Sequence, residues 1–306
     1  MNSSDTFQIP ILKVVIFLFL GLISFGLAPI LVRFATDVEP LVLAAVRTIF
    51  AVLLLMPFWA SKGKSFRQLK NNGVNPLWLG GAGLCLGLHF TFWIASLHYT
   101  SVASASVLVT IHPVMLIVAE SLLFKKSFRP LVWLGVFIAF IGSVFLGIAD
   151  KALAEEFPQA LFGNALAFTA AVIFVIYFLI GRKIRQHSEW IDYVFHVYLY
   201  GAITCTILSF LWVEGVPVIT TPAIIIGLAL AVGPTLMGHG SVNYAVKYVS
   251  PTLLSTLILS EAVFAAIAAY FIFDELPTML SITAMIIIVC GIVLTWSRRI
   301  IGKKDQ

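Results

Sequence analysis

One carboxylate inside an apolar run is the group in this sequence best placed to do chemistry. Residues 253–273 read LLSTLILSEAVFAAIAAYFIF, with Glu261 close to the centre. If this run crosses a bilayer, an ionisable group near its middle costs roughly 2.5–3.5 kcal/mol on insertion scales. We therefore interpret Glu261 as lining a cavity, where it contacts substrate or exchanges a proton. The alternative is a protonated acid that joins two helices by hydrogen bonds.

Histidines in other apolar runs are the next candidates. His112 precedes Pro113, which frees a backbone carbonyl and can bend a helix toward a cavity. An imidazole titrates near neutral pH, which suits proton coupling, and a neutral imidazole bonded to a serine is an equally good interpretation. His89 follows the run GGAGLCLG at 80–87. Because no strand precedes these glycines, we interpret them as a packing face rather than a phosphate loop.

The stretch AVGPTLMGHGSVNY at 231–244 combines polar groups with helix breakers. His239 lies between two glycines, Asn243 follows four residues later, and Gly233 and Pro234 interrupt the helical pattern. An interrupted helix can expose backbone groups to a substrate, so we predict that His239 and Asn243 line a cavity. The alternative is close helix packing through small residues.

Two aromatic residues and one arginine complete the candidates. Trp93 and Tyr177 lie deeper in their runs than the interfacial aromatic belt, and both are predicted to wall a cavity for organic solutes. Arg47 lies only seven residues inside its run. We predict a structural or gating role for it, in which it extends to the membrane surface or pairs with Asp37 or Glu39.

The elements that carry these residues must be membrane helices. The chain has 306 residues, of which 60% are hydrophobic and 11% charged, whereas soluble domains carry about 25% charged residues. Mean hydropathy is +1.04. The sequence therefore predicts an all-α integral membrane protein with ten transmembrane helices. The ten apolar segments fall near 13–33, 40–60, 75–97, 102–124, 130–149, 160–181, 190–213, 222–245, 251–273 and 278–297.

The distribution of basic residues predicts the orientation of these helices. With a cytoplasmic N-terminus, sixteen lysines and arginines fall in inside segments and two, Arg33 and Lys151, in outside segments. This asymmetry places both termini in the cytoplasm. We expect a bacterial plasma membrane, that is, the inner membrane. The net charge of +5 reflects this orientation, and no basic stripe or zinc-finger spacing indicates nucleic-acid binding.

The sequence repeats itself at an offset of 149 residues. Residues 98–146 then lie over residues 247–295 with loops and apolar runs in register. The same offset brings Arg47 onto His196 and His112 onto Glu261. Each half holds five predicted helices, and because five is odd, the second half must be inverted in the membrane. Inverted repeats are typical of secondary transporters, whose substrate site lies near the midplane between the repeats.

This pattern resembles the EamA-type carriers of the drug/metabolite transporter superfamily. The resemblance is carried by LAAVRTIFAVLLL at 43–55, by the paired segments, and by SEAVFAAIAAYFIFDE at 260–275. It covers nearly the whole chain and implies two EamA repeats, at 11–149 and 158–298. Such carriers move small organic solutes, including amino acids, nucleotide-related metabolites and drug-like cations.

The resemblance also implies roles for single residues. Arg47 matches the arginine of the second helix, Glu261 and Glu275 match the two glutamates that bracket helix 9, and His112-Pro113 matches a site in helix 4. Two positions depart from the family pattern: Ala262 replaces a frequent proline, which implies a less kinked helix 9, and Lys126 replaces a frequent glutamate.

The sequence therefore predicts a secondary transporter of a small organic metabolite that works by alternating access. A membrane-embedded enzyme is an alternative, although no HExxH or other close ligand pair is present. A channel is a second alternative, for which a ring of like groups would be expected. We expect no catalytic residues, no metal and no cofactor, and a monomer in the lipid bilayer. The energy source stays open between a proton gradient, another ion gradient, exchange and downhill flow.

Overall fold

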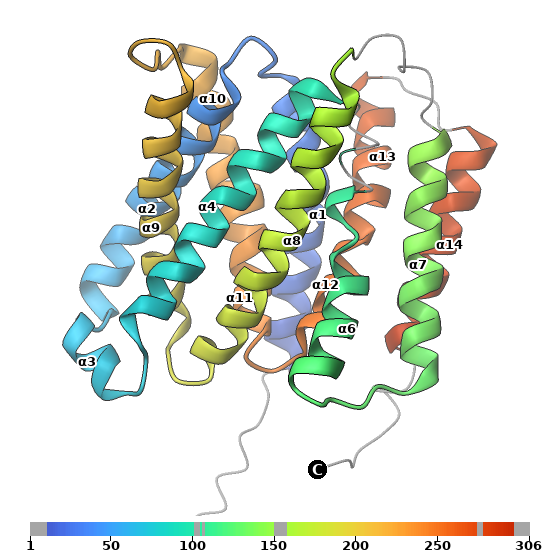
Figure 1. Cartoon of the computed structure of the whole chain (residues 1–306), viewed down its shortest axis with the longest axis horizontal. Helices are drawn as coiled ribbons and strands as arrows, with labels where there is room; N and C mark the ends of the chain where they lie inside the picture. Colours follow the sequence, from blue (N-terminus) through green and yellow to red (C-terminus); the bar gives the residue numbers. More distant parts are fainter. Residues whose placement is uncertain (1–10, 101–104, 106–107, 150–157, 274–277, 297–306) are drawn as a thin grey trace, which may run out of the picture.

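The fold was obtained as a computed structural model, which describes residues 11–100, 105, 108–149, 158–273 and 278–296. Every regular element in these residues is a helix, and most of the helices stand side by side (Figure 1). The elements are α1 (Ile11–Arg33), α2 (Pro40–Lys62), α3 (Phe66–Asn71), α4 (Pro76–Tyr99), α6 (His112–Leu123), α7 (Pro130–Ala149), α8 (Ala160–Arg185), α9 (Trp190–Trp212), α10 (Thr221–Leu230), the π-helix η2 (Ala231–His239), α11 (Gly240–Ala245), α12 (Pro251–Ile258), α13 (Ser260–Phe273) and α14 (Met279–Trp296).

The predicted apolar segments coincide with these helices. In the described residues, eight helical segments have the length and the apolar composition to cross a membrane, and two further apolar helices, in α6 and α7, are shorter. Part of the fourth predicted segment, 102–124, lies outside the described residues. Ten spans therefore stays a prediction, whereas the all-helical membrane fold is confirmed.

The fourth and ninth segments are both interrupted, at equivalent places. A turn at Thr110 and Ile111 precedes α6, and a turn at Leu259 separates α12 from α13. Because Thr110 and Leu259 differ by 149 residues, the two breaks coincide in the repeat. The expectation that Ala262, in place of a proline, makes helix 9 less kinked is therefore wrong, because this helix is interrupted between α12 and α13.

Hydroxyl side chains around the second break bind backbone carbonyls. The Oγ of Ser255 and the Oγ1 of Thr256 both donate to the carbonyl of Thr252, at 2.9 and 2.8 Å, and Ser260 Oγ donates to the carbonyl of Leu257 at 2.7 Å. Such bonds commonly bend helices. They supply a local reason for an interruption without proline.

The eighth segment is interrupted as the sequence predicts. Between α10 and α11 the chain forms the nine-residue π-helix η2, which contains Gly233 and Pro234. Proline lacks the N–H that an α-helix needs, so the wider turn accommodates it. The Oγ1 of Thr235 donates to the carbonyl of Leu230 at 2.9 Å, five residues earlier.

The short helix α3 was not predicted, because its segment has the charges of a loop. Ser65 and Gln68 form a capping box at its start. The Ser-x-x-Gln pattern at 65–68 is the sequence signal that indicates such a start.

The two halves of the chain are interlocked rather than set beside one another. The most extensive packing joins α7 to α14, α4 to α8 and α9, α2 to α9, and α1 to α13 and η2. Each of these pairs takes one helix from each repeat. The cavity described below is therefore enclosed by both repeats.

Glycines allow several of these pairs to approach closely. A Cβ atom at Gly83 would lie 2.4 Å from Tyr200 Cβ, and one at Gly291 would lie 2.4 Å from the backbone nitrogen of Ala139. Gly83 and Gly87 both pack against α9, which agrees with a packing face at 80–87, whereas Gly81 has no neighbour within 4 Å of such an atom.

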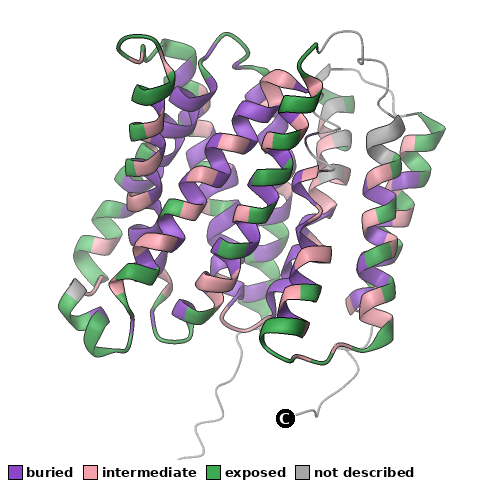
Figure 2. Cartoon of the chain, in the orientation of Figure 1, coloured by how far each residue is buried: buried purple, intermediate pink, exposed green. Residues whose placement is uncertain are grey.

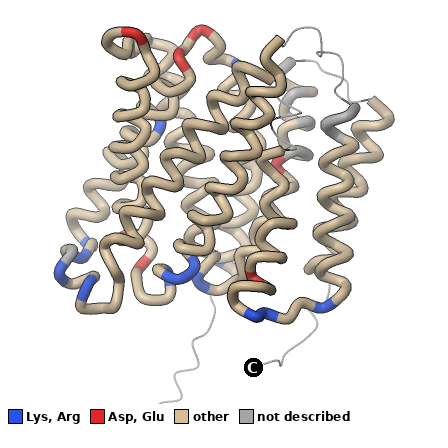
Figure 3. Tube along the Cα trace, viewed as in Figure 1, with Lys and Arg blue, Asp and Glu red and all other residues tan. Residues whose placement is uncertain are grey.

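Charge and burial are distributed as a membrane protein requires. Described Lys and Arg residues gather at the end of the bundle that carries α3, whereas described acidic residues lie toward both ends (Figure 3). Exposed residues follow the outward sides of the helices and buried residues the inner sides (Figure 2). Many exposed side chains are large and apolar, as lipid contact demands.

Candidate functional site

A small cavity lies where the interrupted helices meet. Its volume is about 40 Å³, which is enough for a few water molecules and too small for an organic metabolite. Both repeats contribute to its walls. The lining residues are Phe25, Ala28, Arg47, His89, Phe90, Trp93, Val109, Thr110, His112, Phe174, His239, Ile258 and Glu261.

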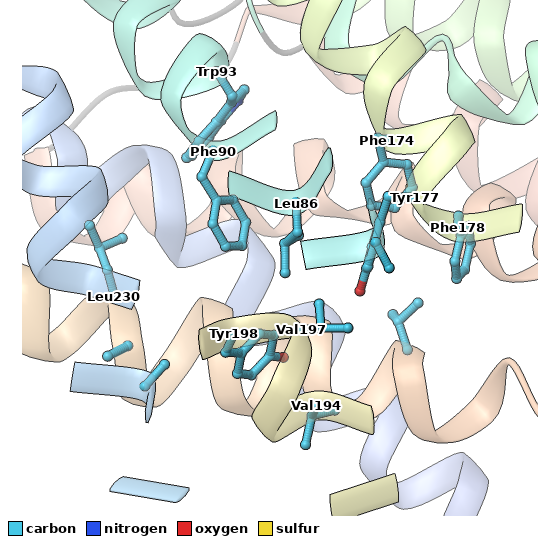
Figure 4. Close-up of a cluster of buried hydrophobic side chains, with 14 of the residues drawn as sticks. Leu86, Phe90, Trp93, Phe174, Tyr177, Phe178, Val194, Val197, Tyr198 and Leu230 are labelled. Carbon is cyan, nitrogen blue, oxygen red and sulfur yellow. The ribbon is translucent and has the colours of Figure 1, made fainter. Parts of the chain in front are cut away.

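Most of the predicted site residues line this cavity together. They are Glu261, His112, His239, His89, Trp93 and Arg47. Asn243 and Tyr177 are not among its lining residues: Tyr177 donates its hydroxyl to Asn243 Oδ1 at 2.6 Å, beyond the cavity wall. Figure 4 shows Phe90 and Trp93 on α4 and Phe174 on α8, with Tyr177 one turn along α8.

The helix breaks position the two pseudo-equivalent residues. His112 is the first residue of α6, directly after the turn at Thr110 and Ile111. Glu261 is the second residue of α13, after the turn at Leu259. Pro113 suits this position because a proline in the first turn of a helix loses no hydrogen bond there. The first break thus presents Thr110 and His112 to the cavity, and the second presents Glu261.

Arg47 is placed differently from its prediction. It is 1% exposed, and it neither extends to the membrane surface nor forms an ion pair with Asp37 or Glu39 within the described residues. Its Nε donates to Thr235 Oγ1 at 2.6 Å. Its guanidinium carbon lies 4.0 Å from the centre of the Phe90 ring. The side chain is too deep in α2 to extend outward, because η2 packs over it.

These contacts fix the plane of the guanidinium group and leave one nitrogen of it unsatisfied. Arg47 Nη1 is buried and has no hydrogen-bond partner in the described residues. The hydroxyl of Tyr198 donates to the carbonyl of Thr235 at 2.9 Å, which holds the partner of Arg47 in place. Leaving a buried charged donor unsatisfied is costly, so this nitrogen is poised for an anionic group.

The three histidines of the cavity form one aromatic cluster. The rings of His89 and His239 are 6.0 Å apart, and His112 and Phe174 are 4.8 Å apart. His89 Nδ1 lies 3.0 Å from the carbonyl oxygen of Ala170. His112 Nδ1 is buried without a partner in the described residues.

Glu261 shares the cavity with Arg47 but is not bonded to it. Within the described residues, no ion pair within 4.0 Å and no hydrogen bond joins the two side chains. Glu261 is partly exposed, whereas Arg47 is buried. The two side chains are therefore separated and both line the same small cavity.

Glu120 joins two helices near the basic end of the bundle. One of its carboxylate oxygens forms an ion pair with Lys126, at 2.9 Å. Its second oxygen accepts the backbone N–H of Thr252 at 2.9 Å and also the hydroxyl of that residue. Glu120 is buried and joins the end of α6 to the start of α12; it is not among the lining residues of the cavity.

The sequence did not single out several residues of the site. Phe25, Phe90 and Phe174 are three of 25 phenylalanines, so nothing in their type marks them. Thr235 is likewise an ordinary residue whose role depends on Arg47. Its place beside Gly233-Pro234 was the one available signal. In the part of the chain that the structure describes, no three His, Cys, Asp or Glu side chains gather as a metal site would.

Interrupted membrane helices that deliver polar side chains to one internal cavity define a transporter-like architecture. The EamA-like transporter family model matches residues 12–148 and again residues 161–297. The chain therefore belongs to the EamA-like transporter family. The two matches repeat the two halves that the offset of 149 residues indicated.

Individual relatives carry transporter names. The chain is 26% identical over 272 residues to an uncharacterized transporter of Archaeoglobus fulgidus, covering 86% of this chain and 90% of the relative. It is 26% identical over 254 residues to an S-adenosylmethionine uptake transporter of Rickettsia bellii, covering 79% of each. A solved crystal structure shares the fold with a TM-score of 0.75 at 19% identity, covering 92% of this chain and 96% of that one.

Proposed function

We propose that this protein is a secondary transporter that moves a small organic metabolite across the plasma membrane by alternating access. The observation that carries the proposal is the pair of helix breaks at equivalent positions of the two repeats. Together with the π-helix η2, these breaks direct His112, Glu261 and His239 into one cavity. Discontinuous helices in corresponding positions of inverted repeats are typical of carrier binding sites.

The candidate substrates are amino-acid-like, nucleotide-related or drug-like solutes. The S-adenosylmethionine uptake transporters among the relatives support an organic metabolite. The aromatic walls of the cavity agree with a substrate that has apolar parts. Because the cavity volume is only about 40 Å³, binding requires the surrounding helices to separate, as alternating access supposes.

A second pocket supports an access route from the end of the bundle opposite the basic one. It has a volume of about 240 Å³ and is lined by residues 36–40 together with His98, Tyr99 and Trp212. Arg47 lies seven residues beyond Pro40 on the same helix, which corresponds to roughly 10 Å. A solute bound in this pocket would thus need to move about two helical turns along α2 to reach the cavity.

The proposed orientation places the basic end of the bundle in the cytoplasm. The charge distribution in Figure 3 supports it, because basic residues favour the cytoplasmic side of a membrane. We propose ten spans, both termini inside, a bacterial inner membrane and a monomer as the working unit.

The test is counterflow in vesicles that hold only this protein. Amino acids, nucleosides and organic cations are offered at two pH values, with the wild type beside Glu261→Gln. Saturable exchange that weakens in the variant is the expected result. The absence of flux for every solute would overturn the proposal, and conversion of a solute to a product would favour an embedded enzyme.

A further inference from the structure

We propose that the substrate is a small zwitterion with an apolar remainder, whose anionic group binds Arg47 and whose ammonium group binds Glu261. This inference rests on the proposed function and specifies the chemical class of the solute. It comes from the placement of a basic and an acidic side chain that line one cavity without contacting each other.

The anionic end is assigned by the state of the Arg47 side chain. Its Nε is used by Thr235, its face lies on Phe90, and its Nη1 is buried without a partner in the described residues. A guanidinium held in this way is oriented before any ligand arrives, so little side-chain entropy is lost on binding. Carboxylates and phosphates are the groups that such a planar donor recognises, and a carboxylate is the smaller of the two.

The cationic end is assigned to Glu261. Its carboxyl group lies in the first turn of α13 and has no ion pair with Arg47 within the described residues. Apart from Arg47, the other polar lining residues are three histidines and Thr110. Glu261 is therefore the lining residue that can supply a full negative charge for an ammonium group.

Charge balance explains why a zwitterion fits better than a simple ion. An ammonium group beside Glu261 favours the ionised form of this residue, and its negative charge then balances the positive charge of Arg47. A simple anion or cation would satisfy one of the two groups and bring an uncompensated charge into a low-dielectric site. A zwitterion satisfies both and leaves the cavity neutral, which also lowers the cost of carrying it past the apolar surroundings.

The walls determine what the remainder of the solute can be. Phe25, Phe90, Trp93 and Phe174 surround the charged groups, with Val109 and Ile258 beside them. Such a lining favours an aliphatic or aromatic side chain over a polar one. An amino acid with an apolar side chain is the simplest solute that has all three parts.

The first test uses three solutes of the same shape and different charge: leucine, the anion N-acetylleucine and the cation leucinamide. Purified protein in vesicles is preloaded with leucine, and entry of each labelled solute is measured. We expect leucine to enter at least about tenfold faster than either analogue, because each analogue leaves one buried charge unpaired. Preferred entry of either analogue would overturn the zwitterion and leave the transporter standing.

Variants locate the two ends. Arg47→Met is expected to abolish the advantage of leucine over leucinamide, and Glu261→Gln its advantage over N-acetylleucine. Equal losses for all three solutes in both variants would overturn the assignment. Arg185→Met is the control for the loss of a buried arginine, since Arg185 is also 1% exposed but lies outside the cavity and bonds backbone carbonyls of Asn243 and Ser188.

Folding and binding are checked separately from flux. Each variant must keep its size-exclusion profile in detergent, and Arg47→Lys and Glu261→Asp serve as conservative replacements that should retain part of the selectivity. Stabilisation against heat is measured with the same three solutes. A wild-type protein that neither transports nor is stabilised by any solute of the wider panel would overturn the proposed function itself, together with this inference.

Discussion

The two interrupted helices of the bundle share a backbone device and differ in chemistry. In the first repeat the turn at Thr110 and Ile111 is followed by His112, and in the second the turn at Leu259 is followed by Glu261. The break is kept at the same place although only the first has a proline beside it. Both repeats therefore place a polar side chain in the cavity at the equivalent position, and the type of that side chain determines which ligand group it can bind.

A second equivalent pair diverges further. Arg47 lines the cavity and bonds Thr235 on η2. His196, at the matching position of α9, instead places its Nδ1 2.7 Å from the carbonyl of Asp192 and packs edge-on against Trp59 at 5.5 Å. Structural symmetry therefore does not give a symmetric site, and the positive charge of the cavity comes from one repeat only.

The largest expected effect is the difference in counterflow between variants of Arg47 and of its repeat equivalent His196. We expect Arg47→Met to lower counterflow by about 100-fold, because it removes the anion-binding donor. Its stability should change by less than ~1 kcal/mol, since Arg47 has no ion-pair partner in the described residues and the loss of its bond to Thr235 is offset by relief of the cost of burying an incompletely bonded guanidinium. His196→Gln should keep more than half of the flux. Flux assays in vesicles measure transport, and thermal unfolding in detergent measures stability. Similar losses of flux in the two variants would contradict a special role of Arg47.

A smaller difference is expected between Glu261 and His112. Glu261→Gln should lower flux about tenfold, and His112→Gln about two- to threefold, because an imidazole can be replaced by another neutral hydrogen-bonding group. Initial rates in vesicles are the measurement. Undiminished flux in Glu261→Gln would make this residue structural and direct attention to His239 and the aromatic walls.

The contact between α6 and α12 should matter for stability more than for selectivity. Glu120→Ala removes the acceptor for the backbone N–H and the hydroxyl of Thr252, which we expect to lower the free energy of unfolding by about 2 kcal/mol. Lys126→Ala is the control, because a partly exposed ion pair contributes less than about 1 kcal/mol. Denaturant titration in mixed micelles compares them; equal losses would assign the effect to the ion pair.

The smallest effect tests the packing between the repeats. Gly83→Ala inserts a methyl group 2.4 Å from Tyr200 Cβ and should cost about 1–2 kcal/mol. At Gly80 the nearest atom would be 3.9 Å away, so Gly80→Ala should be neutral or stabilise by up to about 1 kcal/mol. Melting temperatures of the two variants decide this, and a destabilised Gly80→Ala would contradict the packing described here.

The sequence predicted the helices well because lipid imposes a strong pattern. Apolar runs about 20 residues long, the basic loops and the offset of 149 residues are properties of the chain itself, and they led to the helical fold and to the repeat. The break in the eighth segment could also be predicted, from Gly233 and Pro234. The break before Glu261 could not, because the hydroxyl–carbonyl bonds around it involve serines and threonines, which also occur in unbroken helices.

The site was predictable in part for a related reason. Charged and imidazole groups are rare in apolar runs, so Glu261, His112, His89 and His239 could be singled out one by one. Which of them meet depends on contacts between distant helices. Because Arg47 lies only seven residues from the start of its apolar run, the sequence suggested that its side chain reaches the membrane surface. In the structure η2 packs against α2, and the contacts of Arg47 with Thr235 and Phe90 hold it in the cavity instead.

The interlocked packing has a consequence for how the chain is made. The first repeat leaves the ribosome before α8, α9 and α14 exist, yet these later helices pack against α2, α4 and α7. Until the second repeat has been synthesised, the glycine-rich surfaces of the first repeat and Arg47 therefore lack the helices that cover them in the finished protein. The first repeat thus reaches its final packing only after the second has been inserted, and we expect either half expressed alone to be unstable and the two halves expressed together as separate chains to assemble.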